Sequence, residues 1–299
     1  MTGTRQVEEA EPLVHCSAVL GEAPLWCAES RMLLWLDLDD PALFTLAWDD
    51  PLSLRRQTLP VRVSCLARTR DPQLFVAATE CSLATISSNG TLIPHHRIEE
   101  PGLAQLNDGK CDPRGRFWVG SAGVPRGRTS GRLHRVSASQ TDVVIEGGLG
   151  MSNGLAWSSD EKHFFHVDSL AGTIWSWSFD ATTGLIRNRR VFASIDPAQG
   201  LFDGLAADDE GGVWVAVWGA GEVRRYDSAG RLDRIIEIPT AEVSSVAFAG
   251  PDLDTLCITS AGGDGGEPRA RTGDELAGGL FVYKPGVSGV PVAAFESQL

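Results

Sequence analysis

Short apolar runs alternate with polar, glycine-rich segments along the whole chain. Six of these runs are mostly apolar over five positions, a length typical of β-strands. No long stretch has the apolar spacing of an amphipathic helix. The centres of the six runs recur every 40 to 48 residues, the spacing of four-stranded propeller blades. The runs are residues 33–37, 74–78, 117–121, 164–168, 213–217 and 255–259.

A second β-like run follows most of the apolar runs, and glycine or Asn/Asp turns separate the two, as hairpins require. The pattern therefore predicts an all-β protein, a six-bladed β-propeller that occupies residues 1–299 as a single domain. We expect residues 1–14 to be either an N-terminal tail or a closing strand. The glycine-rich, charged segment 262–276 is expected to be either a lid over the channel mouth or a plain surface hairpin.

A short segment with a polar first residue lies roughly ten residues before each apolar run. If each segment opens the innermost strand of its blade, the pseudo-sixfold symmetry places the six polar side chains around one end of the central channel. The six residues are Glu22, Ser64, Asp108, Asn153, Asp203 and Ser244.

Four of these residues, Glu22, Asp108, Asn153 and Asp203, would form an oxygen-rich ring. Such a ring repels itself unless a cation, protons or bridging water relieve the crowding, and a hard divalent ion is the simplest solution. Ionised Glu22 and Asp203 would balance the charge of the ion and leave coordination positions open for water and substrate, as Lewis-acid hydrolysis requires. The alternative is that the Asp-Gly and Asn-Gly dipeptides only form turns. Their shared position in four repeats favours the ring.

The composition narrows the possible partners. The 299-residue chain is 42% hydrophobic and has a formal net charge of −13, which would repel a nucleic-acid backbone. The six cysteines lack metal-ligand spacing, the N-terminus lacks an apolar signal core, and no run approaches the length of a membrane span. We therefore expect a cytoplasmic protein that acts on a small molecule, without nucleic-acid or membrane partners. The oligomeric state stays open.

Several motifs together resemble the family of senescence marker protein, gluconolactonase and luciferin-regenerating-enzyme-like propellers, from Leu20 to Tyr283. The resemblance implies that Glu22, Asn153 and Asp203 are the protein ligands of one catalytic divalent ion. It also gives the metal-proximal or substrate-contacting role to Asn107 rather than to Asp108. The matching segments are LGEAPLW at 20–26, NDGKCDPRGRFWVG at 107–120, MSNGLAW at 151–157, VDS at 167–169, NRR at 188–190, FDGL at 202–205 and AGGLF at 277–281.

Two positions near the expected substrate depart from the family pattern. Gln105 stands where sugar lactonases of this family typically carry Arg, and Ala122-Gly123 stands where they often carry an acidic residue. Both changes remove charge that could hold substrate hydroxyls, while the metal ligands stay intact. We therefore expect Gln105 and Asn107 to contact the substrate, and a less polar lactone or a differently substituted sugar acid is an alternative to a simple aldonolactone.

The sequence as a whole predicts a hydrolase that opens a small lactone, such as a sugar lactone, with one divalent ion. The ion would polarise the carbonyl while Asp203 acts as general base for an attacking water, although direct attack by a carboxylate stays open. Calcium or zinc is the expected ion, and manganese, magnesium or iron would also fit the ligands. Two other interpretations are a metal-binding propeller without catalysis and a phosphotriesterase-like hydrolase that uses the same site.

Overall fold

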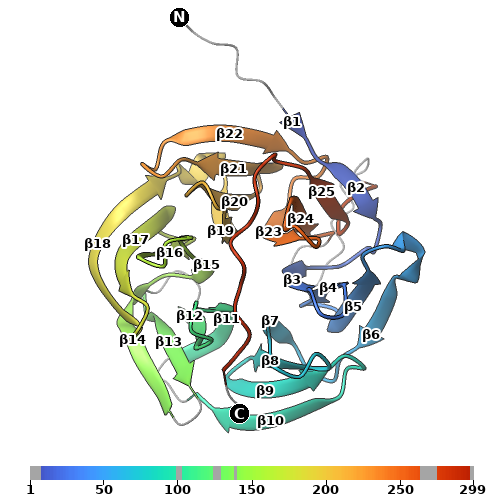
Figure 1. The fold of residues 1–299 in the computed structure, drawn as a ribbon, viewed down its shortest axis with the longest axis horizontal. Helices are drawn as coiled ribbons and strands as arrows, with labels where there is room; N and C mark the ends of the chain where they lie inside the picture. The colour runs from blue at the N-terminus through green and yellow to red at the C-terminus, as the bar shows by residue number, and fades with distance from the viewer. Residues whose placement is uncertain (1–7, 99–102, 124–128, 138–139, 263–274, 297–299) are drawn as a thin grey trace, which may run out of the picture.

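Six small antiparallel sheets surround a central axis in the computed structural model, which describes residues 8–98, 103–123, 129–137, 140–262 and 275–296 (Figure 1). The protein is therefore a six-bladed β-propeller, as the sequence predicts. In five of the blades, four consecutive strands form a meander from the channel to the rim, and in the sixth the outer strand comes from the N-terminal residues.

The first three blades are formed by consecutive strands. Blade 1 contains β3 (Gly21–Cys27), β4 (Met32–Asp37), β5 (Ala42–Ala47) and β6 (Arg55–Thr58). Blade 2 contains β7 (Val63–Arg68), β8 (Leu74–Thr79), β9 (Ser82–Ser87) and β10 (Leu92–Arg97). Blade 3 contains β11 (Leu103–Cys111), β12 (Phe117–Gly123), β13 (Gly131–Ser137) and β14 (Gln140–Leu149).

The last three blades repeat this order. Blade 4 contains β15 (Ser152–Trp157), β16 (His163–Asp168), β17 (Thr173–Asp180) and β18 (Leu185–Ser194). Blade 5 contains β19 (Leu201–Ala207), β20 (Val213–Trp218), β21 (Glu222–Tyr226) and β22 (Leu232–Glu237). Blade 6 contains β23 (Val243–Ala249), β24 (Thr255–Ser260) and β25 (Leu280–Tyr283).

The N-terminal residues complete the ring of blades. Strand β2 (Glu11–Val14) pairs antiparallel with β25 and so becomes the outer strand of blade 6. The two-residue strand β1 (Glu8–Glu9) pairs parallel with β22 of blade 5. Residues 8–14 therefore form closing strands, the second of the two alternatives considered for residues 1–14. The expected lid at 262–276 lies almost entirely outside the described residues.

The six apolar runs are the second strand of each blade. Their fully buried central residues include Trp35, Trp118 and Trp214, which pack against the neighbouring blade or the outer strands. A second strand has a sheet neighbour on both edges and a blade on both faces. Continuous apolar sequence is what such a strand needs, because neither of its faces meets water.

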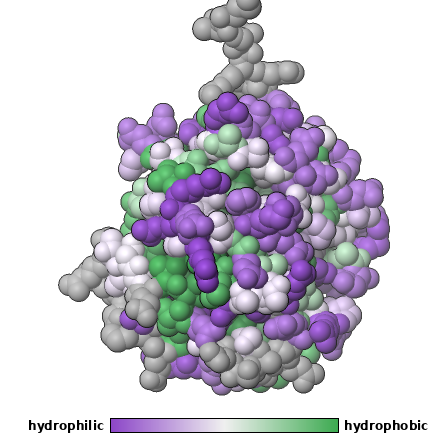
Figure 2. All heavy atoms as spheres, turned by 60° about the vertical axis from the view of Figure 1, so that its left-hand side comes forward, coloured by the Kyte–Doolittle hydropathy of each residue, from purple (hydrophilic) through white to green (hydrophobic). Residues whose placement is uncertain are grey.

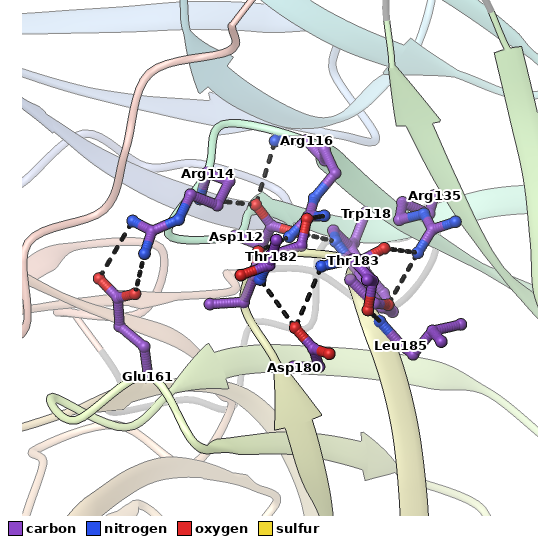
Figure 3. A network of polar contacts seen from close by, with 12 residues as sticks. Asp112, Arg114, Arg116, Trp118, Arg135, Glu161, Asp180, Thr182, Thr183 and Leu185 are labelled. Carbon is purple, nitrogen blue, oxygen red and sulfur yellow. Dashed lines mark hydrogen bonds and ion pairs between the residues drawn. The ribbon is translucent and has the colours of Figure 1, made fainter.

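A polar network ties the inner end of blade 3 to the β17–β18 hairpin of blade 4 (Figure 3). Asp112 is fully buried and accepts hydrogen bonds from Arg116 Nε at 2.6 Å and Trp118 Nε1 at 3.0 Å. Arg116 in turn donates to the carbonyl oxygens of Ala181 and Thr182. The buried carboxylate is thus paired with a cation that also joins two blades.

The outer face of blade 4 is mostly hydrophilic, with one area where hydrophobic atoms gather (Figure 2). On β18, Leu185 and Val191 are 46% and 55% exposed. These side chains lie at the rim of the propeller, away from the channel.

The described residues contain two short 3-10 helices, η1 (Pro51–Ser53) and η2 (Pro197–Gln199), and no helix long and apolar enough to cross a membrane.

Residues 285–296, here called the strap, cross the centre of the propeller (Figure 1). Val290 N donates to Ala207 O at the end of β19, and Phe295 N donates to Arg68 O at the end of β7. The strap therefore lies at the C-terminal ends of the inner strands. A cavity of about 200 Å³ lies between the strap and the inner strands. Its lining includes Ala23, Ala67, Asp108, Lys110, Ala156, Ala206, Ala247, Val290 and Val292.

Candidate metal and substrate site

The polar first residues of the six repeated segments all lie at register shifts in the inner strands. The pairing between the first and second strand slips at the polar residue or directly after it in every blade, between Glu22 and Leu25 in blade 1 and between Phe202 and Leu205 in blade 5, for example. The same slip occurs in the other four blades. A β-bulge turns a side chain away from its regular direction and is common beside active sites. The repeated bulge therefore marks the end of the channel opposite the strap.

The glycines that follow the polar residues permit close approach between inner strands. A Cβ atom on Gly154 would lie 2.5 Å from Asp203 O, and a Cβ on Gly204 would lie 2.0 Å from Ser245 Oγ. Both glycines lie inside strands rather than in turns. The Asn-Gly and Asp-Gly pairs therefore bring neighbouring blades together at the channel, and the turn interpretation is wrong for them.

Two of the six polar residues stabilise the ring of inner strands. Ser64 Oγ donates to Asn107 O at 2.9 Å, and Ser244 Oγ donates to Gly21 O. Each bond joins the inner strands of neighbouring blades. These two hydroxyls are consequently occupied by backbone, and the chemistry of the channel end is left to the acidic and amide side chains.

Three carboxylates share the channel end, and none of them has a cationic partner within ion-pair distance among the described residues. Burial, together with the negative charge of Asp108, raises the pKa of Glu22 to about 8. Burial and the charges of Glu22 and Asp108 raise the pKa of Asp203 well above its usual range. Burial also raises the pKa of Asp108, against the opposing effect of Lys110. The structure thus brings together three acidic side chains whose ionised forms repel one another.

The oxygen atoms of this cluster are sparsely hydrogen-bonded. Glu22 Oε2 accepts one bond from Ala23 N at 2.9 Å, and Asp108 Oδ1 accepts one from Gly109 N at 2.7 Å. Asp203 Oδ1 is buried and has no hydrogen-bond partner among the described residues. An unpaired buried carboxylate oxygen is costly, so its presence indicates a site for a ligand.

Asn153 and Asn107 face each other across blades 4 and 3. Asn107 Nδ2 donates to Asn153 Oδ1 at 3.0 Å and to Ser152 O at 2.9 Å. Asn153 Nδ2 donates to Ser169 Oγ at 3.0 Å. Because Nδ2 of Asn107 already donates twice, its side-chain oxygen Oδ1 is the atom left to accept a hydrogen bond from a substrate hydroxyl or a water.

The side-chain oxygen atoms of Glu22, Asn153 and Asp203 fit a hard divalent ion. Carboxylate and amide oxygens are the ligands that such ions prefer, and a cation would relieve the repulsion that raises the pKa values of Glu22 and Asp203. Within the described residues, His, Cys, Asp and Glu alone form no group of three that could hold a metal ion. A metal site here would therefore include a ligand of another residue type, and the sequence predicts Asn153 for that role.

The position within the repeated segments predicts Asp108 as a member of the ring, whereas the family resemblance assigns the role near the metal or substrate to Asn107. The bulge in β11 spans both residues, since pairing with β12 slips between Leu106 and Gly109. Asn107 reaches Asn153, and Asp108 interacts with the charges of Glu22 and Asp203. The two expectations are therefore compatible, because both side chains lie at the same channel end.

Gln105 lies two residues before Asn107 on β11 and pairs with Ala122 of β12. Gly123, the other departure from the family pattern, pairs with Leu103 on the same two strands. The positions that lack the family's charges are thus neighbours in space.

Lys110 and Ser169 have no role that the sequence predicts. Lys110 Nζ donates to Leu205 O at 2.7 Å, from blade 3 to blade 5, and burial lowers its pKa while Asp108 opposes the effect. Its signal in the sequence is that it is the only charged residue at the third position of the six repeated segments. Ser169 belongs to the VDS segment that matches the family, but nothing local links it to Asn153.

Comparison with known proteins agrees with this architecture. A pentonolactonase from Haloferax volcanii is 32% identical over 93% of this chain and 95% of its own length. A 6-deoxy-6-sulfogluconolactonase from Pseudomonas putida is 32% identical over 94% of this chain and 97% of its own length. The crystal structure of regucalcin from Agrobacterium tumefaciens, described as a calcium-binding protein, superposes with a TM-score of 0.88 at 26% identity, covering 99% of this chain and 100% of that one. Residues 20–262 match the SMP-30/gluconolactonase/LRE-like region, and the chain belongs to that family.

Proposed function

We propose that this protein is a lactonase that opens a small sugar lactone with one divalent ion held by Glu22, Asn153 and Asp203. The observation that carries the proposal is the buried, unpaired Oδ1 of Asp203 beside two further carboxylates. Relatives of almost the same length are named for lactone hydrolysis, which supports the reaction class.

The ion would supply Lewis-acid polarisation of the lactone carbonyl and stabilisation of the developing oxyanion. Asp203 contributes the general base, because its unpaired oxygen is available to take a proton from an attacking water. The side-chain oxygen Oδ1 of Asn107 accepts a hydrogen bond from a substrate hydroxyl, since Nδ2 of the same amide already donates to Ser152 O and Asn153 Oδ1. The strap crosses the other end of the channel, so the substrate would reach the site from the end where Glu22 and Asp203 lie.

The substrate is proposed to be less charged or less hydroxylated than a simple aldonolactone. Gln105 and Ala122 pair with each other close to Asn107, so the neutral surface lies where substrate hydroxyls are expected. A guanidinium or a carboxylate at these positions would hold hydroxyls by charge-assisted hydrogen bonds, which are about twice as strong as neutral ones.

The test is proton release from a panel of aldonolactones, less polar lactones and a phosphotriester, with metal-stripped protein restored with calcium, zinc, manganese or magnesium. Metal should restore lactone turnover, and Asp203→Asn should lower it about 10²–10⁴-fold because base and ligand are lost together. Asp252→Asn, a change in an exposed turn, is the matched control. Metal binding without turnover of any ester would leave a non-catalytic propeller, and preference for the phosphotriester would leave a phosphotriesterase.

The substrate class has its own test in Gln105→Arg. If the neutral pair selects against hydroxyl-rich substrates, the new cation should raise kcat/KM for an aldonolactone roughly tenfold relative to a less polar lactone, about 1.4 kcal/mol of discrimination. An unchanged ratio between the two substrates would show that residue 105 does not contribute to the choice.

A further inference from the structure

Asn153 differs from the other two proposed ligands in one chemical respect. Both ends of a carboxylate can bind a cation, whereas an amide binds through its oxygen and repels a cation with its NH2 group. The two ends have nearly the same size, so shape alone does not select the productive orientation. Some neighbouring group must hold the amide with its oxygen at the site.

The hydrogen bonds of Asn153 define its orientation from both ends. Asn107 Nδ2 donates to Asn153 Oδ1 at 3.0 Å, and an NH2 group has no capacity to accept. Asn153 Nδ2 donates to Ser169 Oγ at 3.0 Å. A flipped amide would place the NH2 groups of Asn153 and Asn107 against each other, so Asn107 excludes that orientation. The Ser169 hydroxyl can donate or accept, and in the observed orientation it accepts from Asn153 Nδ2. Ser169 supplies the acceptor that the observed orientation requires.

The backbone around Ser169 is fixed relative to Asn153. Ser169 N donates to Met151 O at 3.0 Å, and Gly172 N donates to Ser169 O at 3.1 Å. The preceding carboxylate of Asp168 accepts hydrogen bonds from Gly150 N and Met151 N. These bonds join the turn after β16 to the segment that enters β15. The Ser169 hydroxyl, which is only 2% exposed, is therefore held at a set place beside the Asn153 amide.

We propose that Ser169 is a positioning residue that holds the Asn153 amide with its oxygen toward the divalent ion, an inference that rests on the proposed metal site. Its hydroxyl does not itself touch the ion or the substrate. Asn107 completes the arrangement from the other end of the amide, and its own orientation is fixed by the carbonyl of Ser152. One chain of amides and hydroxyls from blades 3 and 4 thus selects the ligand atom.

The first test measures metal affinity directly, by competition of calcium, zinc or manganese alone with a chromophoric chelator. Ser169→Ala should weaken binding about 10–100-fold, the usual cost of losing a group that orients a ligand. Ser176→Ala is the matched control, because Ser176 is a buried serine of the same blade whose hydroxyl has no hydrogen-bond partner among the described residues. Its metal affinity should equal that of the wild type. Thermal unfolding of the metal-free variants checks that both fold.

The second test separates orientation from general structural support. Asn153→Asp replaces the amide with a carboxylate, which offers an oxygen in either orientation. In that background, Ser169→Ala should change the metal affinity less than about twofold, if orientation is the whole effect. Equal affinity of wild type and Ser169→Ala, or the same loss in both backgrounds, would overturn the inference while leaving the metal site in place. A wild-type protein that binds none of the three ions would overturn the proposed metal site and this inference with it.

Discussion

The carboxylates at the two ends of the inner strands are treated in opposite ways. At the strap end, Asp208 is fully buried and accepts hydrogen bonds from Arg225 Nε at 2.7 Å, Trp214 Nε1 at 2.8 Å and Gly212 N at 2.6 Å. Asp112 has the same kind of environment in blade 3 (Figure 3). At the end opposite the strap, Glu22 and Asp203 lie beside another carboxylate, and few hydrogen-bond donors face them.

The contrast separates structural from functional acidic residues in one fold. A buried carboxylate whose oxygens all have donors contributes to folding, and its removal leaves several buried donors without an acceptor. A buried carboxylate without hydrogen-bond donors destabilises the folded state unless a cation binds to it. The same residue type therefore has opposite expected effects on stability at the two ends.

The largest effect is expected from Asp208→Ala. Trp214 Nε1 and Gly212 N would lose their buried acceptor, and Arg225 would lose one of its three carboxylate partners. The loss of these hydrogen bonds should lower the free energy of unfolding by about 3–5 kcal/mol in urea denaturation. Metal affinity should stay unchanged. Asp227→Ala, at an exposed pair with Arg231, is the control and should leave the urea midpoint almost unchanged. A small loss for Asp208→Ala would mean that its network does not stabilise the fold.

The next effect is a pH dependence of the metal-free protein. The pKa of Glu22 is raised from 4.5 to about 8, so the folded state binds a proton that the unfolded state releases within that window. The contribution of Glu22 to stability is full below pH 4.5 and is lost as the pH rises through 8, by about 4–5 kcal/mol. Urea denaturation at several pH values measures the slope. Glu22→Gln or saturating calcium should flatten it, and an unchanged slope in Glu22→Gln would assign the effect to other groups.

A smaller effect of unusual sign is expected from Asp203→Asn. Removing one of three mutually repelling carboxylates should stabilise the metal-free protein at pH 8 by about 1–2 kcal/mol. Added metal should then stabilise the wild type and have no effect on the variant, because only the wild type binds it. Thermal unfolding with and without metal shows both effects. Destabilisation of the metal-free variant would contradict the idea that this carboxylate opposes folding.

The smallest effect concerns the backbone beside Glu22. Ala23 has a φ of 52°, in the left-handed region that costs a residue with a Cβ about 1 kcal/mol. Ala23→Gly should therefore raise the stability by about 0.5 kcal/mol after the greater flexibility of glycine in the unfolded chain is counted. A shift in the thermal midpoint of one to a few degrees is the expected size. A lower midpoint would show that the Ala23 methyl group contributes more by packing than its backbone costs.

Much of the fold could be predicted because each blade is a local unit. The apolar runs identified the second strands, and the polar segments before them identified the inner strands, since a hairpin meander keeps neighbours in sequence adjacent in space. The closing role of residues 11–14 could not be chosen over a free tail, because the partner strand, β25, lies at the other end of the chain.

The details of the site could be predicted only in part. Repeat phase found Glu22, Asp108, Asn153 and Asp203, but no residue type announces the bulge that lets Asn107 and Asp108 both reach the channel end. The glycines after the polar residues looked like turn formers because the strands that crowd them belong to other blades.

Ser169 shows the same limit from another side. It follows an apolar strand by one residue, which describes most turn residues in this chain. Its contact with Asn153 joins the end of β16 to β15 and depends on how the turn folds back. The role of such a residue is set by three-dimensional neighbours, and a single sequence gives no period or motif from which to infer it.

The strap links two blades that lie on opposite sides of the propeller. It bonds to the end of β19 in blade 5 and to the end of β7 in blade 2. The last described residues of the chain thus form a crossbar, which resists separation of the blades at this end of the channel.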